Sequence, residues 1–239
     1  MKKLVFFLAG LFASYALTAQ TINDENAVKR DVKGFHAIKV SHGIQLMLTE
    51  GTEEAVAVSA NDPEFRDKIR TEVVNGELRI YFDYDWWKEF NRGSNRKRLR
   101  AYVSFVKLDA VRASSGSTVN VEGVIKATKL NLEASSGATF NGKVEVGEMM
   151  VDQSSGSVIK ISGTVSGKLV ADGSSGSQFK GYELTVENCD ADLSSGAGVQ
   201  VTVNKELSVE ASSGGYVNYK GNGLIRNVRT SSGGSVRKS

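Results

Sequence analysis

Five carboxylates recur at nearly constant spacing in the second half of the chain, each two residues before a Ser-Ser-Gly triplet. The acids are Glu133, Asp152, Asp172, Asp192 and Glu210, and Arg112 and Arg229 hold the same position at the two ends of the row. A row of carboxylates could bind Ca²⁺ or a cationic partner. Surface acids beside a base would also suit a polysaccharide lyase or hydrolase, although only analogy with enzymes built on repeating β-structure supports that interpretation. The simpler interpretation is a solvated acidic face.

A second candidate site lies between residues 84 and 100, which contain both tryptophans and several bases. Aromatic faces flanked by hydrogen-bond donors suit sugar rings or anionic glycans, and exposed tryptophan often anchors interfaces. Alternatively, the aromatic side chains pack as a lid over the neighbouring residues. The candidate ligand-binding residues are Trp86, Trp87, Phe90, Arg92, Arg96 and Arg98.

No residue is assigned a catalytic role. A serine nucleophile needs a histidine base, but His36 and His42, the two histidines, both precede the first Ser-Ser-Gly triplet. Cys189, the single cysteine, stands in an apolar column and is expected to be a small buried hydrophobic residue. Apart from the calcium hypothesis, we therefore expect no cofactor and a non-enzymatic protein.

The triplets themselves predict the architecture. Ser-Ser-Gly occurs seven times at intervals of 18 to 21 residues, ending at Gly116, Gly137, Gly156, Gly176, Gly196, Gly214 and Gly233. A repeat of this length indicates units that bury their apolar faces by stacking on one another, as in a solenoid. The glycine is expected at a corner with positive φ, and the serines are expected to hydrogen-bond local backbone there.

Apolar residues recur within each repeat with the alternation of a β-strand. One column stands three residues before the triplet's first serine and another five residues after it. The acidic row has the opposite parity, so it should face solvent. These patterns predict an all-β protein, a parallel β-solenoid with about 20 residues per coil, whose regular coils span residues 111–236.

Residues 34–110 are less regular and are expected to form widened first coils that close the N-terminal end. Asn75-Gly76 between two apolar runs predicts a β-hairpin, and Asn61–Glu64 predicts the start of a short helix. No linker is evident, so residues 20–239 are expected to form one domain. After the last triplet, residues 235–239 leave open strand edges that could join another copy, which makes a homo-oligomer a candidate.

The sequence resembles the secreted bacterial proteins grouped as putative autotransporter adhesins with a head-GIN domain, over about residues 34–236. The resemblance rests on residues 35–40, on Gly43-Ile44-Gln45 where the family has Gly-Ile-Asn, on Glu50-Gly51, on residues 75–80 and on the triplets. It implies a right-handed, single-stranded β-helix at the cell envelope or outside the cell. It brings no functional residues, and Gln45 departs from the family pattern.

Residues 1–19 combine two lysines, an apolar run and a small residue before Gln20, which predicts a signal peptide cut after Ala19. A retained membrane anchor is the alternative, but the apolar run is short for a bilayer span. Export places the protein in the periplasm, at the cell surface or outside the cell, with no membrane span in the mature chain. The formal charge of the whole chain is +3, which argues against nucleic acid as a partner. We expect a binding or adhesion module for a glycan or surface protein, with a polysaccharide lyase or hydrolase as the alternative.

Overall fold

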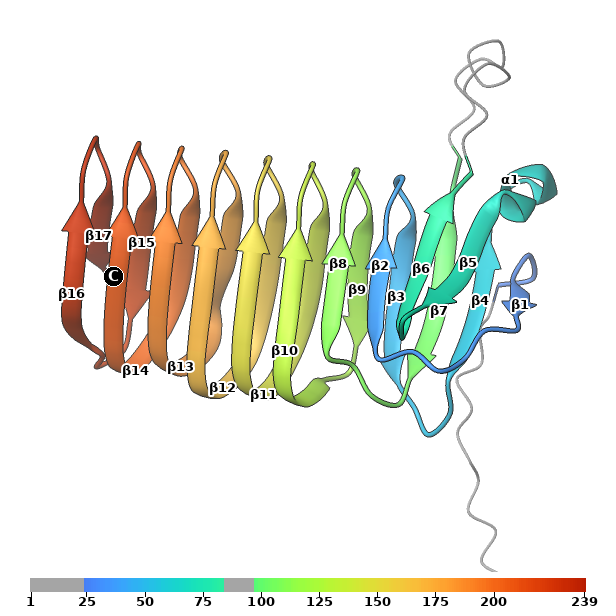
Figure 1. Cartoon of the computed structure of the whole chain (residues 1–239), viewed down its shortest axis with the longest axis horizontal. Helices are drawn as coiled ribbons and strands as arrows, with labels where there is room; N and C mark the ends of the chain where they lie inside the picture. The colour runs from blue at the N-terminus through green and yellow to red at the C-terminus, as the bar shows by residue number, and fades with distance from the viewer. Residues whose placement is uncertain (1–23, 84–96) are drawn as a thin grey trace, which may run out of the picture.

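The computed structural model describes residues 24–83 and 97–239 and is a parallel β-solenoid with one short helix (Figure 1). The predicted all-β class and repeat architecture are confirmed. In chain order the elements are β1 (Val28–Arg30), β2 (Ala37–Val40), β3 (Gln45–Glu50), β4 (Ala55–Ser59), α1 (Pro63–Asp67), β5 (Ile69–Val74), β6 (Glu77–Phe82), β7 (Arg100–Phe105), β8 (Ala110–Ala113), β9 (Thr118–Glu122), β10 (Ile125–Ala134), β11 (Thr139–Gln153), β12 (Val158–Gly173), β13 (Gln178–Leu193), β14 (Gly198–Ala211), β15 (Tyr216–Lys220), β16 (Leu224–Thr230) and β17 (Ser235–Lys238). No helix in this part of the chain is long and apolar enough to cross a membrane.

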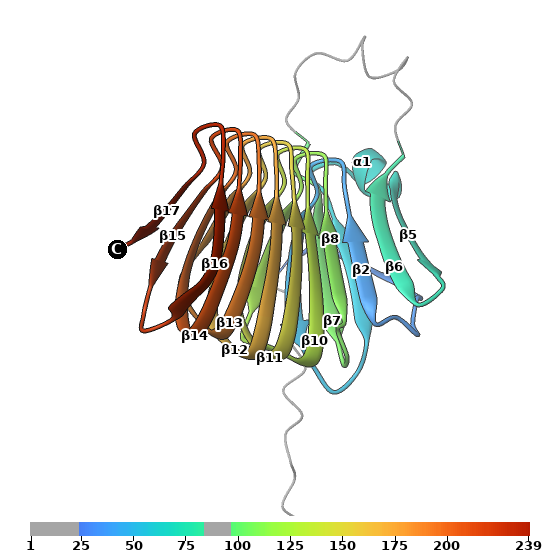
Figure 2. The same cartoon turned by 60° about the vertical axis from the view of Figure 1, so that its left-hand side comes forward.

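Each regular coil contributes to two parallel layers that pack face to face (Figure 2). The front face holds the segment before each Ser-Ser-Gly turn, and the back face holds the segment after it. In β12, for example, residues 158–165 lie on the back face and residues 169–173 on the front face, with a register shift between Val165 and Lys168. The strand bends at this shift, opposite the turn edge where the triplets lie.

The triplets form tight turns that stack along one edge, as predicted. In the first of them, the Ser117 N–H donates to the Ser114 carbonyl at 3.1 Å. Both central residues have positive φ, 52° at Ser115 and 70° at Gly116, which is the pattern of a type I′ turn. The Gly116 N–H donates to the Ser136 carbonyl in the next coil at 2.9 Å. The glycine prediction is therefore confirmed, but the positive φ of the serine was not foreseen.

The serine hydroxyls behave differently from the prediction. Within the described residues, those of the seven triplets have no protein hydrogen-bond partner, because the backbone groups they were expected to bind are already paired between coils. The bonds come instead from buried serines directly after the glycine. Ser157 Oγ donates to the Ala134 carbonyl at 2.8 Å, and Ser177 Oγ donates to the Gln153 carbonyl at 3.1 Å. Where a serine stands at this position, its hydroxyl ties the turn to the neighbouring coil.

The two predicted apolar columns form the core between the faces. On the front face the column runs from Val111 to Val209, and on the back face it runs from Val119 to Val217; every member is at most 4% exposed. Stacking like residues at the strand spacing of about 4.8 Å buries each layer on its neighbours. Burial fails at the C-terminal end, where Val228 is 38% exposed.

The N-terminal coils do not stack in chain order, which corrects the expected succession. The coil of β2 and β3 lies between that of β6 and β7 and that of β8 and β9. Its connection, Ser41-His42-Gly43, is an eighth stacked turn, because Gly43 N–H donates to the Ser115 carbonyl at 2.9 Å. This turn does not match the Ser-Ser-Gly pattern, because histidine replaces the second serine.

Antiparallel strands and α1 close the N-terminal end. β5 pairs with β6 through the predicted Asn75-Gly76 hairpin, and β1 and β4 extend the back face. The predicted helix start is also confirmed: the Asp62 carboxylate caps α1 by accepting from the Glu64 N–H at 2.9 Å. The helix ends before Ile69, which begins β5.

Candidate ligand-binding face

The five predicted acids form one straight row on the front face, in register from coil to coil and exposed to solvent. The non-sequential coil order extends this row toward the N-terminus. The complete charge ladder is Glu72, Arg79, Lys39, Arg112, Glu133, Asp152, Asp172, Asp192, Glu210 and Arg229. Sequence reasoning missed its first three members. The signal that could have revealed Lys39 is its place two residues before Ser41-His42-Gly43.

The basic part of the ladder is largely neutralised by two glutamates. Arg112 Nε donates to Glu133 Oε1 at 2.9 Å, and its terminal nitrogen donates to Glu77 Oε2 at 2.5 Å. Arg79 Nε reaches the other oxygen of Glu77 at 3.0 Å. Burial opposes ionisation of Glu77, but the hydrogen bonds and positive charges of the two arginines outweigh it and lower the pKa of this carboxyl. At the other end of the ladder, Arg229 donates to Glu210 at 2.9 Å.

Asp152, Asp172 and Asp192 are the unneutralised part of the ladder, since none of them has an ion pair among residues 24–83 and 97–239. Partial burial raises the pKa of the central Asp172, and the like charges of Asp192 and Asp152 raise it further. Ionisation of Asp172 therefore costs stability in the folded state. Such a row favours a positively charged ligand, which would relieve the repulsion.

Replacing Asp172 by asparagine should raise the melting temperature at pH 7, by no more than about 2 °C because the site is solvated. An Asp with a raised folded-state pKa destabilises above that pKa, so the gain should shrink as the pH falls through it. Asp190→Asn is the matched control, because Asp190 lies on the same face but is paired with Lys168. The control should lose stability. A lower melting temperature for Asp172→Asn would refute the repulsion.

The row does not gather into a metal-binding cluster. Within the described part of the chain, no three His, Cys, Asp or Glu side chains are placed to hold one metal ion. The carboxylates lie one coil apart, in line. The calcium hypothesis for Glu133, Asp152, Asp172, Asp192 and Glu210 remains a prediction that needs a binding measurement.

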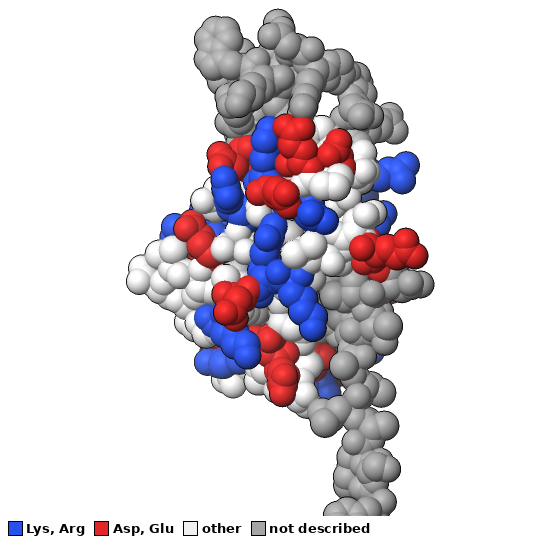
Figure 3. All heavy atoms as spheres, turned by 90° about the vertical axis from the view of Figure 1, so that its right-hand side faces the viewer, with Lys and Arg blue, Asp and Glu red and all other residues white. Residues whose placement is uncertain are grey.

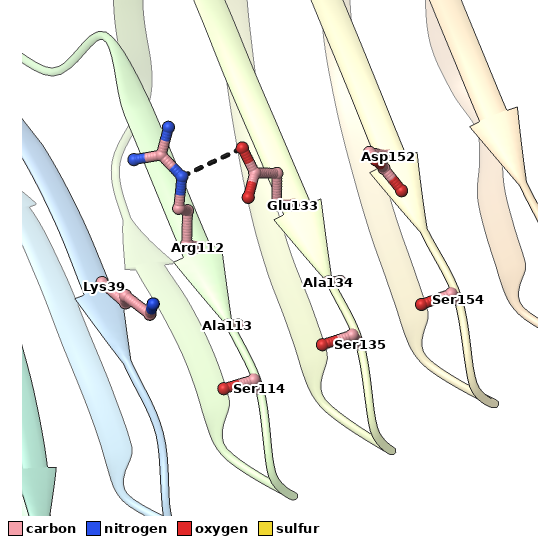
Figure 4. Close-up of a pocket in the computed structure, with 9 residues that line it drawn as sticks. All are labelled: Lys39, Arg112, Ala113, Ser114, Glu133, Ala134, Ser135, Asp152 and Ser154. Atoms are coloured by element: carbon pink, nitrogen blue, oxygen red, sulfur yellow. Dashed lines mark hydrogen bonds and ion pairs between the residues drawn. The ribbon is translucent and has the colours of Figure 1, made fainter.

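A shallow hollow runs between the charge ladder and the first serines of the turns (Figure 4). Lys39, Arg112, Glu133 and Asp152 border it on one side, and the serines Ser114, Ser135 and Ser154 border it on the other. These side chains come from successive coils and project outward in two rows. Lys39 has no ion-pair partner within the described residues. The hollow therefore offers the Lys39 ammonium group, carboxylates and a line of hydroxyl groups, whereas the Arg112 guanidinium is already paired.

An adjoining hollow adds apolar surface to the same face. Asn131, Met150 and Val170 line it together with Glu133, Asp152 and Asp172. Met150 is 45% exposed, although it is a large apolar residue. A partner on this face would therefore meet apolar side chains beside the unneutralised carboxylates.

The predicted aromatic site cannot be placed, since Trp86, Trp87, Phe90, Arg92 and Arg96 lie outside the described residues. Arg98, its remaining member, is exposed, and its backbone N–H donates to Asn61 Oδ1 at 3.0 Å. Next to it, Lys97 Nζ lies 4.8 Å from the centroid of the Phe82 ring. Both residues lie near the turn edge. The carbonyl groups of Ile80 and Leu99 accept hydrogen bonds from Ser41 N–H and Gln45 N–H, on either side of the Ser41–Gly43 turn in the adjacent coil.

The histidines form no catalytic constellation with the triplet serines. His36 Nδ1 lies 3.2 Å from Asp109 Oδ2, and His42 Nδ1 lies 2.8 Å from Ser41 Oγ inside the eighth turn. Among the described residues, no carboxylate is paired with His42, so this exposed Ser-His contact lacks the third group that orients a catalytic base.

Cys189 is fully buried in the core, as predicted. Burial, with a smaller contribution from Asp190, raises the pKa of the thiol to about 12. Because the thiolate is the reactive species, the native protein should not react with an aromatic disulfide reagent at pH 8 over an hour. One equivalent should react in denaturant. Rapid labelling of the folded protein, followed spectrophotometrically, would contradict the assignment.

Comparisons with known proteins agree with this architecture. The family model described as "Putative auto-transporter adhesin, head GIN domain" matches residues 34–223. A comparison with curated proteins finds no match.

Solved structures share the fold at low sequence identity. A putative adhesin from Bacteroides fragilis is 14% identical, with a TM-score of 0.78 over 90% of this chain and 98% of that one. A putative adhesin from Parabacteroides merdae is also 14% identical, with a TM-score of 0.70 over 89% and 95%. A putative lipid binding protein from Parabacteroides distasonis is 15% identical, with a TM-score of 0.62 over 90% and 98%. The family match spans most of the chain, and the protein therefore belongs to the auto-transporter adhesin family with the head GIN domain.

Proposed function

We propose that this chain is an exported, non-enzymatic binding module whose front face docks a positively charged surface of another protein. The observation that carries the proposal is the row of Asp152, Asp172 and Asp192, exposed at successive coils and free of ion pairs within the described residues. Membership of an adhesin family supports a binding role. The signal-like residues 1–19 and the family description both support export, with the periplasm, the cell surface and the extracellular space as the candidate locations.

The mixed character of the front face favours a protein partner. Met150 and Val170 lie beside the carboxylates, so a partner with basic and apolar side chains would match both features. Repetition along the solenoid lets several weak contacts act together, which raises avidity without any single strong contact. An anionic glycan would be repelled by the same row.

A glycan is the second candidate partner, supported by a different observation. Lys39 and the serines Ser114, Ser135 and Ser154 could contact an acidic group and sugar hydroxyls in the first hollow. Trp86 and Trp87, which lie outside the described residues, have the aromatic side chains that stacking on a sugar ring needs. This arrangement would place a glycan toward the N-terminal coils.

The first hollow contains the residue types that a lyase uses, but their side chains do not point toward one common point. Arg112 and Glu133 are bound to one another, and the side chains stand in parallel rows instead of meeting at one point (Figure 4). In a lyase we would expect a base and metal-bound carboxylates to converge on one sugar ring. The geometry therefore supports binding over cleavage.

The experiment measures binding of three probes to the purified protein by calorimetry: a lysine decapeptide, chitosan oligosaccharides and polygalacturonate. The test variant carries Asp152→Asn, Asp172→Asn and Asp192→Asn. The matched control carries Lys160→Gln and Lys180→Gln, two exposed lysines in register on the back face. The test variant should bind the decapeptide about tenfold more weakly than wild type, since three exposed ion pairs together contribute roughly 1.5 kcal/mol. The control should bind it as well as wild type.

Each other outcome has a definite meaning. Equal decapeptide binding by the test variant would refute docking at the acidic row. Binding of polygalacturonate or chitosan that is lost in Lys39→Gln or in Trp86→Ala with Trp87→Ala would favour the glycan candidate. Appearance of an unsaturated sugar product from polygalacturonate would establish a lyase. Calcium binding by wild type but not by the triple variant would establish the calcium site.

A further inference from the structure

We propose that copies of this chain stack head to tail, so that the C-terminal end of one solenoid pairs with the N-terminal end of the next. At the C-terminal end, the only strand among the described residues that pairs with β16 is β14, and all seven residues of β16 are exposed. Leu224 is 75% exposed and Ile225 is 51% exposed, whereas Leu207, the partner of Ile225 one coil earlier, is fully buried. The apolar columns therefore end without a covering layer.

In the part of the chain that the structure describes, each end of the solenoid presents one strand edge without a partner on each face. At the C-terminal end these edges belong to β16 on the front face and β17 on the back face. At the N-terminal end they belong to β5 and β1, which among the described residues pair only with β6 and β4. Stacking along the solenoid axis would bring front edge to front edge and back edge to back edge.

If the columns of the front face continue across such a junction, residues of β16 lie opposite compatible residues of β5 in the next copy. Column by column, the register places Val228 opposite Val73 of the next copy and Thr230 opposite its Thr71. The charge ladder ends in Arg229 and begins with Glu72, so the junction pairs opposite charges. Apolar, Thr–Thr and opposite-charge pairs are the cross-strand pairs that stabilise sheets.

The back face gives one favourable and one unfavourable pair. Val236 would lie opposite Val28, which is 37% exposed at the N-terminal end. In the next column Arg237 would lie opposite Lys29, and these like charges repel. This pair supplies a variant that should tighten the junction.

Overall charge favours head-to-tail over tail-to-tail contact. The 29 residues after Glu210 contain five bases and no acid. Residues 24–83 contain 12 acids and eight bases, and acidic and basic side chains are interspersed on the end that they form (Figure 3). Two C-terminal ends would bring two positive surfaces together, whereas a C-terminal and an N-terminal end attract. Because such a contact does not close on itself, it would build an open filament.

Sedimentation velocity of the purified protein over a concentration series tests the proposal. Wild type should show dimers and longer species that grow with concentration. Glu72→Arg and Arg229→Glu should each weaken association about fivefold, because each places like charges at the junction. Mixing these two variants should restore it, since every junction between unlike copies then pairs opposite charges. Lys29→Glu should strengthen association.

Circular dichroism and melting curves establish that the variants are folded. Monomers alone at all concentrations up to about 1 mM would overturn the proposal, because the dissociation constant of the junction would then be well above that concentration. A closed dimer that Glu72→Arg does not affect would also overturn it and would indicate tail-to-tail contact. Failure here leaves docking at the acidic row unaffected, because that row lies on the side of the solenoid.

Discussion

Gly163→Ala should destabilise the protein by about 3 kcal/mol or more, although it adds only one methyl group. Gly163 lies on the back face in β12 with a φ of +111°, which L side chains rarely adopt. An added Cβ would also lie 2.0 Å from the Val144 carbonyl oxygen of the preceding coil. Relief requires the two coils to separate, so backbone strain and lost strand pairing act together.

Gly156→Ala is the matched control in the same coil. Gly156 lies in a turn with a φ of +69°, and no heavy atom lies within 4 Å of an added Cβ. Only the cost of the left-handed conformation remains, about 1 kcal/mol. Both changes restrict the unfolded chain alike, so the difference between their urea midpoints, followed by circular dichroism, reports the clash. Equal midpoints would mean that the close approach at Gly163 is wrong.

The second large effect is a coupling between Phe179 and Gly181 on the back face. Phe179 is 1% exposed, and a Cβ at Gly181 would lie 2.6 Å from its ring. In the neighbouring coil the buried side chains of Ile159 and Ile161, on either side of Lys160, fill the core at this level. Lys180 stands in register with Lys160. The aromatic ring in one coil therefore occupies the space that a second aliphatic side chain fills in the next.

A double-mutant cycle measures this coupling. Gly181→Ile alone should cost about 3 kcal/mol through overpacking, and Phe179→Ile alone about 1.5 kcal/mol through the space it leaves. The combined variant reproduces the Ile-Lys-Ile pattern of residues 159–161 and should come within about 1 kcal/mol of wild type. Additive losses in the urea midpoints would show that the two positions do not share one packing space.

The regular coils were predictable because stacking is a local rule repeated many times. Seven identical triplets define one register, and the residues on either side of them alternate between core and solvent. The acidic row followed directly from this parity, and its exposure is confirmed. Cys189 was placed in the core for the same reason.

What the sequence did not reveal depends on contacts between distant segments. Nothing local indicates that β2 pairs with both β6 and β8, and this pairing is what adds Lys39 and Arg79 to the ladder. The Ser41–Gly43 turn was not recognised because His42 stands where the triplets have their second serine. The positive φ of each second serine was missed because glycine is the residue expected there, whereas here the ladder of backbone hydrogen bonds along the turn edge holds both residues.

The hydrogen bonds between successive turns also bear on how the molecule can change its length. Each turn uses the same donor and acceptor toward its neighbours, so any layer between Ser135 and Gly214 meets equivalent partners above and below. Duplication or loss of one layer would alter the reach of the rod in steps of about 4.8 Å while leaving both termini as they are. Evolution can thus tune the number of binding positions without redesigning the ends.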